Sequence, residues 1–257
     1  APKRARGASG AAPDALAGPP ARRLRRGIGV ALAYHGAGFT GSGEVRLASL
    51  AAMDLSPDGR PRVLAANTEI GQGTVTVFSQ LAAEALGVPA EFVIVENPDT
   101  ANVPDSGPTV ASRTLMVVGG LIGRCARGMR VRLESFAGAP IAGEAGFRRV
   151  ARRWRAERGP LRVEQRYRKP EGLEWNDDTY RGDAYGVFSY ASCCVEVEVD
   201  LDTGEVQVLE VTTAQDIGKA IHPVLAEGQV EGGTLQALGW ALLEEVHFKD
   251  GRVWNHQ

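Results

Sequence analysis

The chain has 257 residues and a hydrophobic content of 44%, which is typical of a globular protein with a sizeable core. Its 29 Lys and Arg residues balance 31 Asp and Glu residues, so no global basic field favours nucleic acid or an anionic membrane as a partner. No apolar run approaches the roughly 20 residues that span a bilayer, and the first residues lack the apolar core of a secretory signal, so we expect a cytoplasmic protein.

Residues 1–26 are rich in Ala, Pro, Gly and Arg, a composition that predicts a tail or a connector. From Gly27 onward the apolar pattern is of strand type. Residues 44–68 contain two such stretches around the turn S-P-D-G, which predicts a hairpin because Pro, Asp and Gly supply the turn dihedrals. The hairpin leads to the segment T-E-I-G-Q-G.

A helix is expected after Gly73, because apolar side chains recur at helical spacing from Phe78 to Ala85 and Gly87 suits the C-terminal cap. The order of strand, long loop and helix recurs at residues 91–129, where the helix begins near Ser112. It recurs again at residues 193–246. These repeats predict an α+β fold in which mixed sheets are flanked by helices.

An arginine-rich segment lies between the second and third of these units. Residues 147–158 carry six arginines, but their apolar side chains form one helical stripe. The stripe consists of Phe147, Val150, Ala151 and Trp154. We therefore predict a helix with a solvated basic face within 136–159, joining lobes at 27–135 and 160–257 of one domain that spans 27–257.

The G-Q-G triplet precedes a helix start, where unpaired N–H groups and the helix dipole suit an anion. Gly71 and Gly73 would let a ligand approach the backbone. The amide of Gln72 suits a neutral heteroaromatic edge or a metal-bound oxygen better than a phosphate. Most such triplets are ordinary turns, so the triplet alone does not establish a site.

The other two helix starts add polar groups. Ser112, Arg113 and Thr114 place hydroxyls and a guanidinium at a helix start, which suits an anion, although Ser112 also fits a plain N-cap. Gln229 and Gln236 share one helix face with two glycines. The leucines that we expect to pack that helix into a core are Leu235, Leu238, Leu242 and Leu243. The alternative for the glutamine face is close helix packing through its glycines.

No self-contained catalytic motif is present. The sequence contains no H-E-x-x-H and no G-x-S-x-G, its four histidines are scattered, and its three cysteines have no zinc spacing. We predict no metal-ligating side chains and read the cysteines as reduced core residues.

Four ordered segments together resemble the molybdenum-binding large subunit of the xanthine dehydrogenase and aldehyde oxidase family, in its C-terminal part. They are TEIGQGTVTVFSQLAAEALG (68–87), DTANVPDSGPTVASRT (99–114), YRGDAYGVFSYASCCVEVEVDLDTGEV (180–206) and DIGKAIHPVLAEGQVEGGTLQALGWALLEE (216–245). The resemblance implies a molybdenum–molybdopterin cofactor, or its cytosine dinucleotide form, and oxidative hydroxylation of a purine, an aldehyde or an N-heterocycle. It also implies partner chains or domains that carry 2Fe–2S clusters and FAD.

By the same resemblance, cofactor contacts are expected at Gly71, Gln72, Gly73, Ser112, Arg113, Thr114, Gln229 and Gln236. The substrate pocket is expected at Val110 and Ala111. In such a site the three helix starts converge on one cleft.

The family's general base is a glutamate downstream of the helix that matches residues 224–246, and the chain does not include it or the upstream half of the large subunit. Glu69 and Glu231 are the candidate substitutes, but Glu231 points away from the glutamine face, and the direction of Glu69 is open. We therefore expect a fragment or one piece of a split subunit that is inactive alone. The alternative is a non-catalytic homologue or an assembly module with the same fold.

Overall fold

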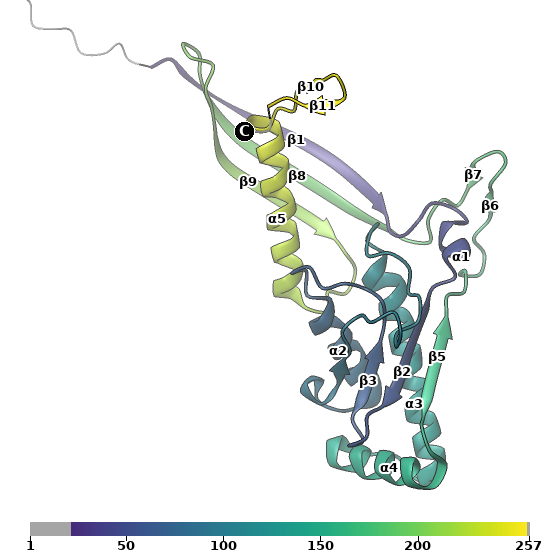
Figure 1. Cartoon of the computed structure of the whole chain (residues 1–257). Helices are drawn as coiled ribbons and strands as arrows, with labels where there is room; N and C mark the ends of the chain where they lie inside the picture. Colours follow the sequence, from purple (N-terminus) through teal and green to yellow (C-terminus); the bar gives the residue numbers. More distant parts are fainter. Residues whose placement is uncertain (1–21, 256–257) are drawn as a thin grey trace, which may run out of the picture. The chain divides into compact units, whose positions relative to one another are not determined.

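The computed structural model describes residues 22–255, which form two compact units (Figure 1). The first unit comprises the described residues up to Ala31 together with Cys193–Thr213, and the second comprises Leu32–Ser192 together with the described residues from Ala214 onward. Residues 1–21 of the predicted tail lie outside the described residues.

A mixed four-stranded sheet forms the core of the second unit, in the order β4-β3-β2-β5. Its strands are β2 (Leu50–Leu55), β3 (Pro61–Leu64), β4 (Ile94–Val95) and β5 (Arg162–Arg166). β2 pairs antiparallel with both β3 and β5, whereas β3 pairs parallel with β4. The predicted hairpin around S-P-D-G is therefore confirmed as β2 and β3.

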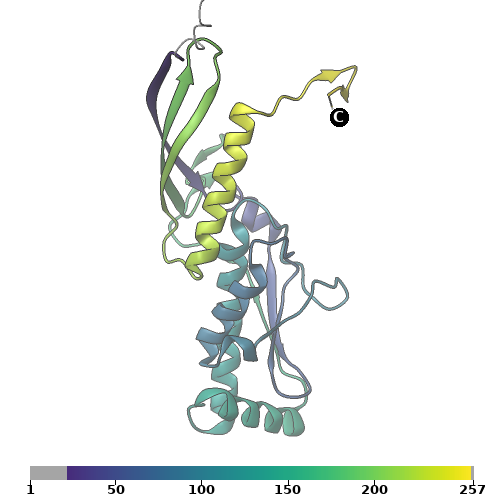
Figure 2. The ribbon, with the colours of Figure 1, turned by 90° about the vertical axis from the view of Figure 1, so that its left-hand side faces the viewer.

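Two long helices pack on this sheet, as Figure 2 shows. α3 (Gly120–Ala137) packs on β2 and β5, and α2 (Thr74–Leu86) packs on α3. The predicted cap of α2 is confirmed, because Gly87 has a left-handed φ of 68° and its N–H bonds the last turn. The largest fully buried apolar side chains of this core are Met53, Phe78, Leu86, Leu121, Ile122, Met129, Leu133 and Phe147.

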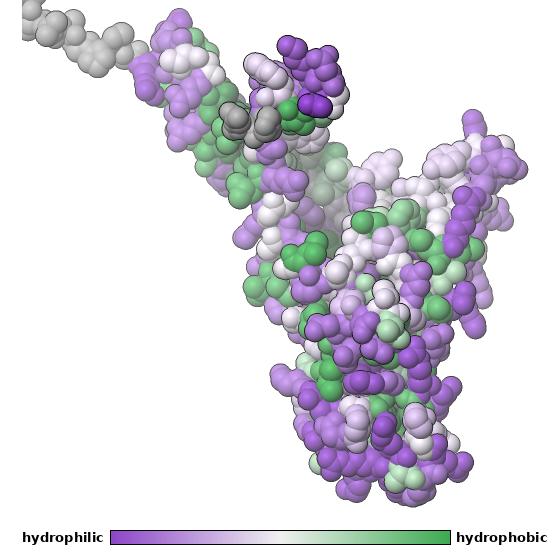
Figure 3. Space-filling model, in the orientation of Figure 1, coloured by the Kyte–Doolittle hydropathy of each residue, from purple (hydrophilic) through white to green (hydrophobic). Residues whose placement is uncertain are grey.

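The arginine-rich segment forms α4 (Gly143–Arg158), and its apolar stripe faces the same core. Phe147 and Ala151 are fully buried, while its arginines lie on a hydrophilic surface at one end of the unit (Figure 3). β5, which follows α4, pairs along β2 and buries Val163. The structure therefore divides the chain differently from the prediction, because α4 packs inside one unit that includes both Leu32–Ala137 and β5.

A three-stranded sheet has the order β1-β8-β9, and its strands run through both units. The strands are β1 (Leu24–Gly36), β8 (Phe188–Asp200) and β9 (Val206–Asp216). Leu24–Arg26 belong to β1 rather than to the predicted tail, and Arg26 forms an ion pair with Glu198 at 3.1 Å. Strand pairing thus extends further towards the N-terminus than composition suggested.

The remaining elements are short, apart from the last helix. They are α1 (Gly43–Leu47), η1 (Ala90–Phe92), η2 (Thr114–Gly119), β6 (Trp175–Asn176), β7 (Arg181–Gly182), α5 (Pro223–Leu242), β10 (Phe248–Lys249) and β11 (Arg252–Val253). The strand expected over 91–96 is a 3₁₀ turn followed by two strand residues. The predicted α+β class is confirmed. No helix within residues 22–255 has both the length and the apolar character needed to cross a bilayer.

α5 does not pack as predicted. None of its residues is buried, and Leu235 and Leu243 are 71% and 87% exposed instead of lying in a core. Gly232 and Gly233 have open space around them, so close packing through these glycines is not seen within the described chain either. Apolar patches lie among polar ones along α5 in Figure 3. The prediction was wrong because the periodicity of a helix shows which side chains share a face but not what covers that face.

Candidate functional site

The G-Q-G loop closes on its own acidic residue. Gly71 and Gly73 have φ of 104° and 90°, values that glycine adopts readily. Their N–H groups both donate to Glu69 Oε1 at 2.9 Å, and the N–H of Val75 donates to Glu69 Oε2 at 3.0 Å. Gly73 is the N-cap residue of α2, so the carboxylate of Glu69 satisfies the N–H groups at this helix start.

This position affects the ionisation of Glu69. Burial opposes the charge, but hydrogen bonds from the N–H groups of residues 75, 73, 71 and 74 outweigh it and lower the pKa of Glu69. The carboxylate is thus ionised at neutral pH and directed to its own loop. The direction that the sequence left open is therefore inward, towards the N–H groups of its own loop.

The amide of Gln72 is also engaged within the loop. Its Nε2 donates to Thr68 O at 2.9 Å and to Thr74 Oγ1 at 2.7 Å, while its Oε1 accepts from the N–H of Ile70 at 2.7 Å. Both Nε2 hydrogens therefore have acceptors, and Oε1 keeps one lone pair for a further donor.

The loop that precedes η2 and α3 contacts the G-Q-G loop through Asn67. Asn67 Nδ2 donates to Thr109 Oγ1 and to Thr114 Oγ1, each at 3.4 Å, and the N–H of Thr68 donates to Thr109 Oγ1 at 3.1 Å. Asn67 is 5% exposed, and its Oδ1 has no hydrogen-bond partner in the described part of the chain. A buried acceptor left unpaired is unusual and costs stability unless a ligand or water pairs with it.

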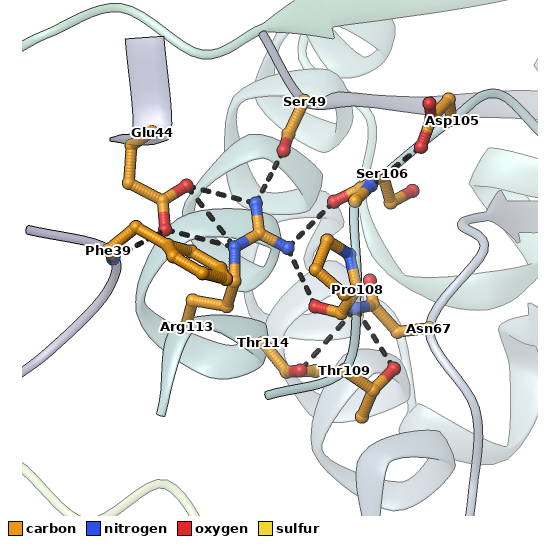
Figure 4. A network of polar contacts seen from close by, with 11 residues as sticks. Phe39, Glu44, Ser49, Asn67, Asp105, Ser106, Pro108, Thr109, Arg113 and Thr114 are labelled. Carbon is orange, nitrogen blue, oxygen red and sulfur yellow. Dashed lines mark hydrogen bonds and ion pairs between the residues drawn. The ribbon is translucent and has the colours of Figure 1, made fainter. Parts of the chain in front are cut away.

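Arg113 lies inside this second loop, not on its surface (Figure 4). It is 0% exposed, and its Nε and Nη2 each bond the carboxylate of Glu44 at 3.0 Å. Nη2 also donates to Ser49 Oγ, and Nη1 donates to the carbonyls of Ser106 and Pro108 at 2.9 and 3.0 Å. All five guanidinium hydrogens are therefore used, and the side chain that the sequence assigned to a phosphate has no donor left for one.

The residues between Val110 and Arg113 adopt an uncommon backbone. Ala111 and Ser112 both have φ of 54°, and the N–H of Gly38 donates to Ala111 O at 2.8 Å. Arg113 is the N-cap residue, so Ser112 is not the cap that one alternative proposed. The helix begins as the π-helix η2. Left-handed residues and π-helical turns both concentrate at functional sites, since each is held in place by its surroundings at a cost in energy. Val110 is 51% exposed beside them.

The start of α5 lies against the start of α2, as Figures 1 and 2 both show. A Cβ placed on Gly73 would lie 2.5 Å from Leu225 Cδ1. His222 caps α5, its Nδ1 accepting from the N–H of Leu225 at 3.2 Å. Residues 67–73 therefore contact the second loop through Thr109 and the start of α5 through Leu225. Gln229 and Gln236 lie further along α5 and are exposed.

We expect Gly73→Ala to lower the free energy of unfolding by about 1–3 kcal/mol, since Gly73 has a positive φ and also touches Leu225. Gly71→Ala is the matched control, because Gly71 has a positive φ but open space around it. Part of the Gly73→Ala loss should disappear in a Leu225→Ala background, as measured by urea unfolding of the double-mutant cycle. Equal coupling of both glycines to Leu225 would contradict the contact between the two helix starts.

A comparison with known families places nearly the whole chain in one family. A family model described as "Molybdopterin cofactor-binding domain" matches residues 8–257. The chain belongs to this family. The resemblance seen in the sequence is thereby confirmed, and the match covers nearly the whole of this chain.

Individual relatives are oxidoreductases. The domain is 34% identical over 244 residues to a probable xanthine dehydrogenase subunit of Bacillus subtilis, and the match covers 89% of this chain and 32% of that protein. Among solved structures, the aldehyde oxidoreductase of Desulfovibrio gigas has a TM-score of 0.73 at 27% identity, covering 84% of this chain and 23% of the other. Quinoline 2-oxidoreductase of Pseudomonas putida 86 has a TM-score of 0.71 at 26% identity, covering 90% and 32%. The chain thus spans about a third or less of these relatives.

The neutral polar groups of this chain suit a pterin cofactor. The orphaned Oδ1 of Asn67 and the spare lone pair of Gln72 Oε1 accept N–H donors of the kind that a pterin edge carries. Gln229 and Gln236 present exposed amides, and Gly232 leaves space for a ligand beside them. No group of three or more His, Cys, Asp or Glu side chains within 22–255 could hold a metal ion directly.

The two groups predicted to bind a phosphate, Arg113 and the start of α2, are not available for one. The guanidinium of Arg113 is already bound by the carboxylate of Glu44, and the N–H groups at the start of α2 are already bound by Glu69. The sequence analysis named Glu69 only as a candidate base, and it missed Glu44, Asn67 and Thr109. The available signals were the acidic residue two positions before G-Q-G and the polar residues that flank each loop, but their partners lie far away in sequence.

Proposed function

We propose that this chain is the cofactor-binding part of a molybdenum hydroxylase of the xanthine dehydrogenase type. The observation that carries the proposal is that residues 67–73 contact both the start of η2 and the start of α5, in a chain that belongs to the molybdopterin cofactor-binding domain family. When bound, the cofactor would supply the oxidative chemistry for hydroxylating an electron-poor carbon of a purine, aldehyde or N-heterocycle.

The residues of the chain would hold and orient that cofactor. Neutral contacts would come from Gly71, Gln72 and Gly73 in the first loop and from Gln229 and Gln236 on α5. Ser112 and Thr114 would contribute hydroxyls from the second loop, and Val110 and Ala111 would border the substrate. Arg113, which is buried, would hold the second loop in shape without touching the cofactor.

The proposal includes partners, because α5 carries apolar side chains that no described element covers. Trp240 is 77% exposed and Leu235 is 71% exposed. Exposed apolar side chains gathered on one element are typical of an interface. Because the chain spans 32% or less of its relatives' length, we assign this surface to the remainder of the molybdenum subunit. Iron–sulfur and FAD chains or domains would then complete the electron path.

We expect the chain, co-expressed with the remainder of the subunit, to retain molybdenum and phosphorus in stoichiometric amounts. Gln236→Ala and Gln229→Ala should each weaken retention by roughly 2- to 13-fold, since a neutral hydrogen bond contributes about 0.5–1.5 kcal/mol. The measurement is elemental analysis of the purified complex by mass spectrometry.

The matched control is Gln207→Ala, an exposed glutamine on β9. It should leave both elements unchanged. A complex that carries no molybdenum in the unsubstituted form would instead favour a non-catalytic homologue. Molybdenum retained equally by all three glutamine variants would remove Gln229 and Gln236 from the site.

A further inference from the structure

We infer that Glu69 is the positioning residue of the G-Q-G loop, and that its carboxylate is the permanent anion at the start of α2. The loop therefore offers a ligand neutral contacts only, and the phosphate of a cofactor binds elsewhere. The part of this inference that concerns a cofactor rests on the proposed function, whereas the part that concerns Glu69 does not.

The geometry at the helix start is that of a bound anion. Three backbone N–H groups, those of Gly71, Gly73 and Val75, converge on the two oxygens of Glu69 at 2.9–3.0 Å. Gly73 contributes no side-chain cap, so Glu69 is the group that satisfies this end of a 13-residue helix. A helix start binds carboxylates and phosphates through the same N–H groups, and one excludes the other.

The conformation of the loop depends on this carboxylate. Gly71 and Gly73 have positive φ, which turns both of their N–H groups towards Glu69 Oε1. Gln72 lies between them, and its amide bonds Thr68, Ile70 and Thr74 within the same turn. Without Glu69 the two glycine N–H groups lose their acceptor. The turn that orients the Gln72 amide then loses the hydrogen bonds that hold it.

The second loop repeats this arrangement independently. Arg113, the one cation that the sequence placed at a helix start, donates its hydrogen bonds to the buried Glu44. Both positive groups that suited a phosphate thus carry a carboxylate of the chain itself. What remains for a ligand around residues 67–73 is uncharged: the free lone pair of Gln72 Oε1 and the unpaired Oδ1 of Asn67.

The test compares the full chain with its Glu69→Ala variant in urea unfolding, carried out in chloride, in formate and in inorganic phosphate at equal ionic strength. We expect the variant to unfold at a lower urea concentration in chloride. Formate and phosphate should raise its midpoint in a saturable way, because either anion can bind the three N–H groups that Glu69 leaves free. The unsubstituted chain should show no such saturable shift.

The matched control is Glu91→Ala, since the Glu91 carboxylate makes no hydrogen bond or ion pair within the described chain. It measures the general stabilisation that phosphate gives to any folded protein. The side-chain amide of Gln72, followed by NMR, separates positioning from general loss of stability. Its hydrogens should exchange faster in Glu69→Ala and slow down again when formate is added.

Two outcomes would overturn the inference. The first is a saturable response of the unsubstituted chain to phosphate, which would mean that the start of α2 is open. The second is a Glu69→Ala variant that behaves as Glu91→Ala does in every salt. If Glu69→Ala does not fold, Glu69→Gln retains one acceptor oxygen and turns an NH₂ group towards donors, so a lowered midpoint is still expected. None of these measurements needs the cofactor. A chain that fails to retain molybdenum would therefore contradict the proposed function but not the inference about Glu69.

Discussion

Replacing Arg113 by methionine is expected to lower the free energy of unfolding by about 3–5 kcal/mol, because the substitution leaves the buried carboxylate of Glu44 without its partner. Arg113 is 0% exposed and Glu44 is 5% exposed, so water cannot replace the lost hydrogen bonds. Urea unfolding of the purified variant measures the effect. The second loop should also lose its shape, since Arg113 holds the carbonyls of Ser106 and Pro108.

Two further variants test whether the loss comes from the buried ion pair. The double variant Arg113→Met with Glu44→Met should be less destabilised than Arg113→Met alone, because apolar pairs often replace buried ion pairs without loss. Arg153→Met breaks the exposed pair with Glu157, whose side chains are 55% and 51% accessible, and should change stability by less than about 1 kcal/mol. Arg113→Met unfolding at the same urea concentration as Arg153→Met would contradict the buried pair.

Truncation of Phe78 to alanine is expected to cost about 3–5 kcal/mol of unfolding free energy, since it removes a ring that is 2% exposed and leaves a cavity in the core on which α2 packs. Because α2 begins directly after the G-Q-G loop, the same variant should loosen the proposed site. Phe78→Leu keeps more of the volume and should cost less.

The control for this variant is Val75→Ala on the same helix. Val75 is 43% exposed, and such surface substitutions usually change stability by no more than about 0.5 kcal/mol. Both variants are compared by urea unfolding under one set of conditions. If Phe78→Ala costs no more than Val75→Ala, the core between α2 and α3 is not packed as described.

Local features of the fold were predictable because neighbouring residues decide them. The turn between β2 and β3, the cap at Gly87 and the apolar stripe of α4 each depend on residues within a few positions of one another. The order of four segments was likewise enough to indicate the family, which the match over residues 8–257 confirms.

Partners across long separations were not predictable. Arg113 and Glu44 are 69 positions apart, and Asn67 and Thr114 are 47 apart. A guanidinium at a helix start reads as an anion site in the sequence, yet a carboxylate brought there by the fold can neutralise it. The exposure of α5 was not predictable for a related reason, since an apolar stripe in a sequence does not show which element covers it.

The sequence by itself determined the class of fold and the family, because spacing, turn residues and the order of motifs can all be read along the chain. It also predicts the three loops in which a cofactor site should lie. Only the tertiary structure decided which charges remain free. Glu44, which lies 69 positions from Arg113, takes the guanidinium that looked ready for phosphate, because a buried cation needs a hydrogen-bonded partner and only the folded chain brings this one near. Glu69 takes the start of α2 from within its own loop, because the N–H groups there have no partner inside the helix.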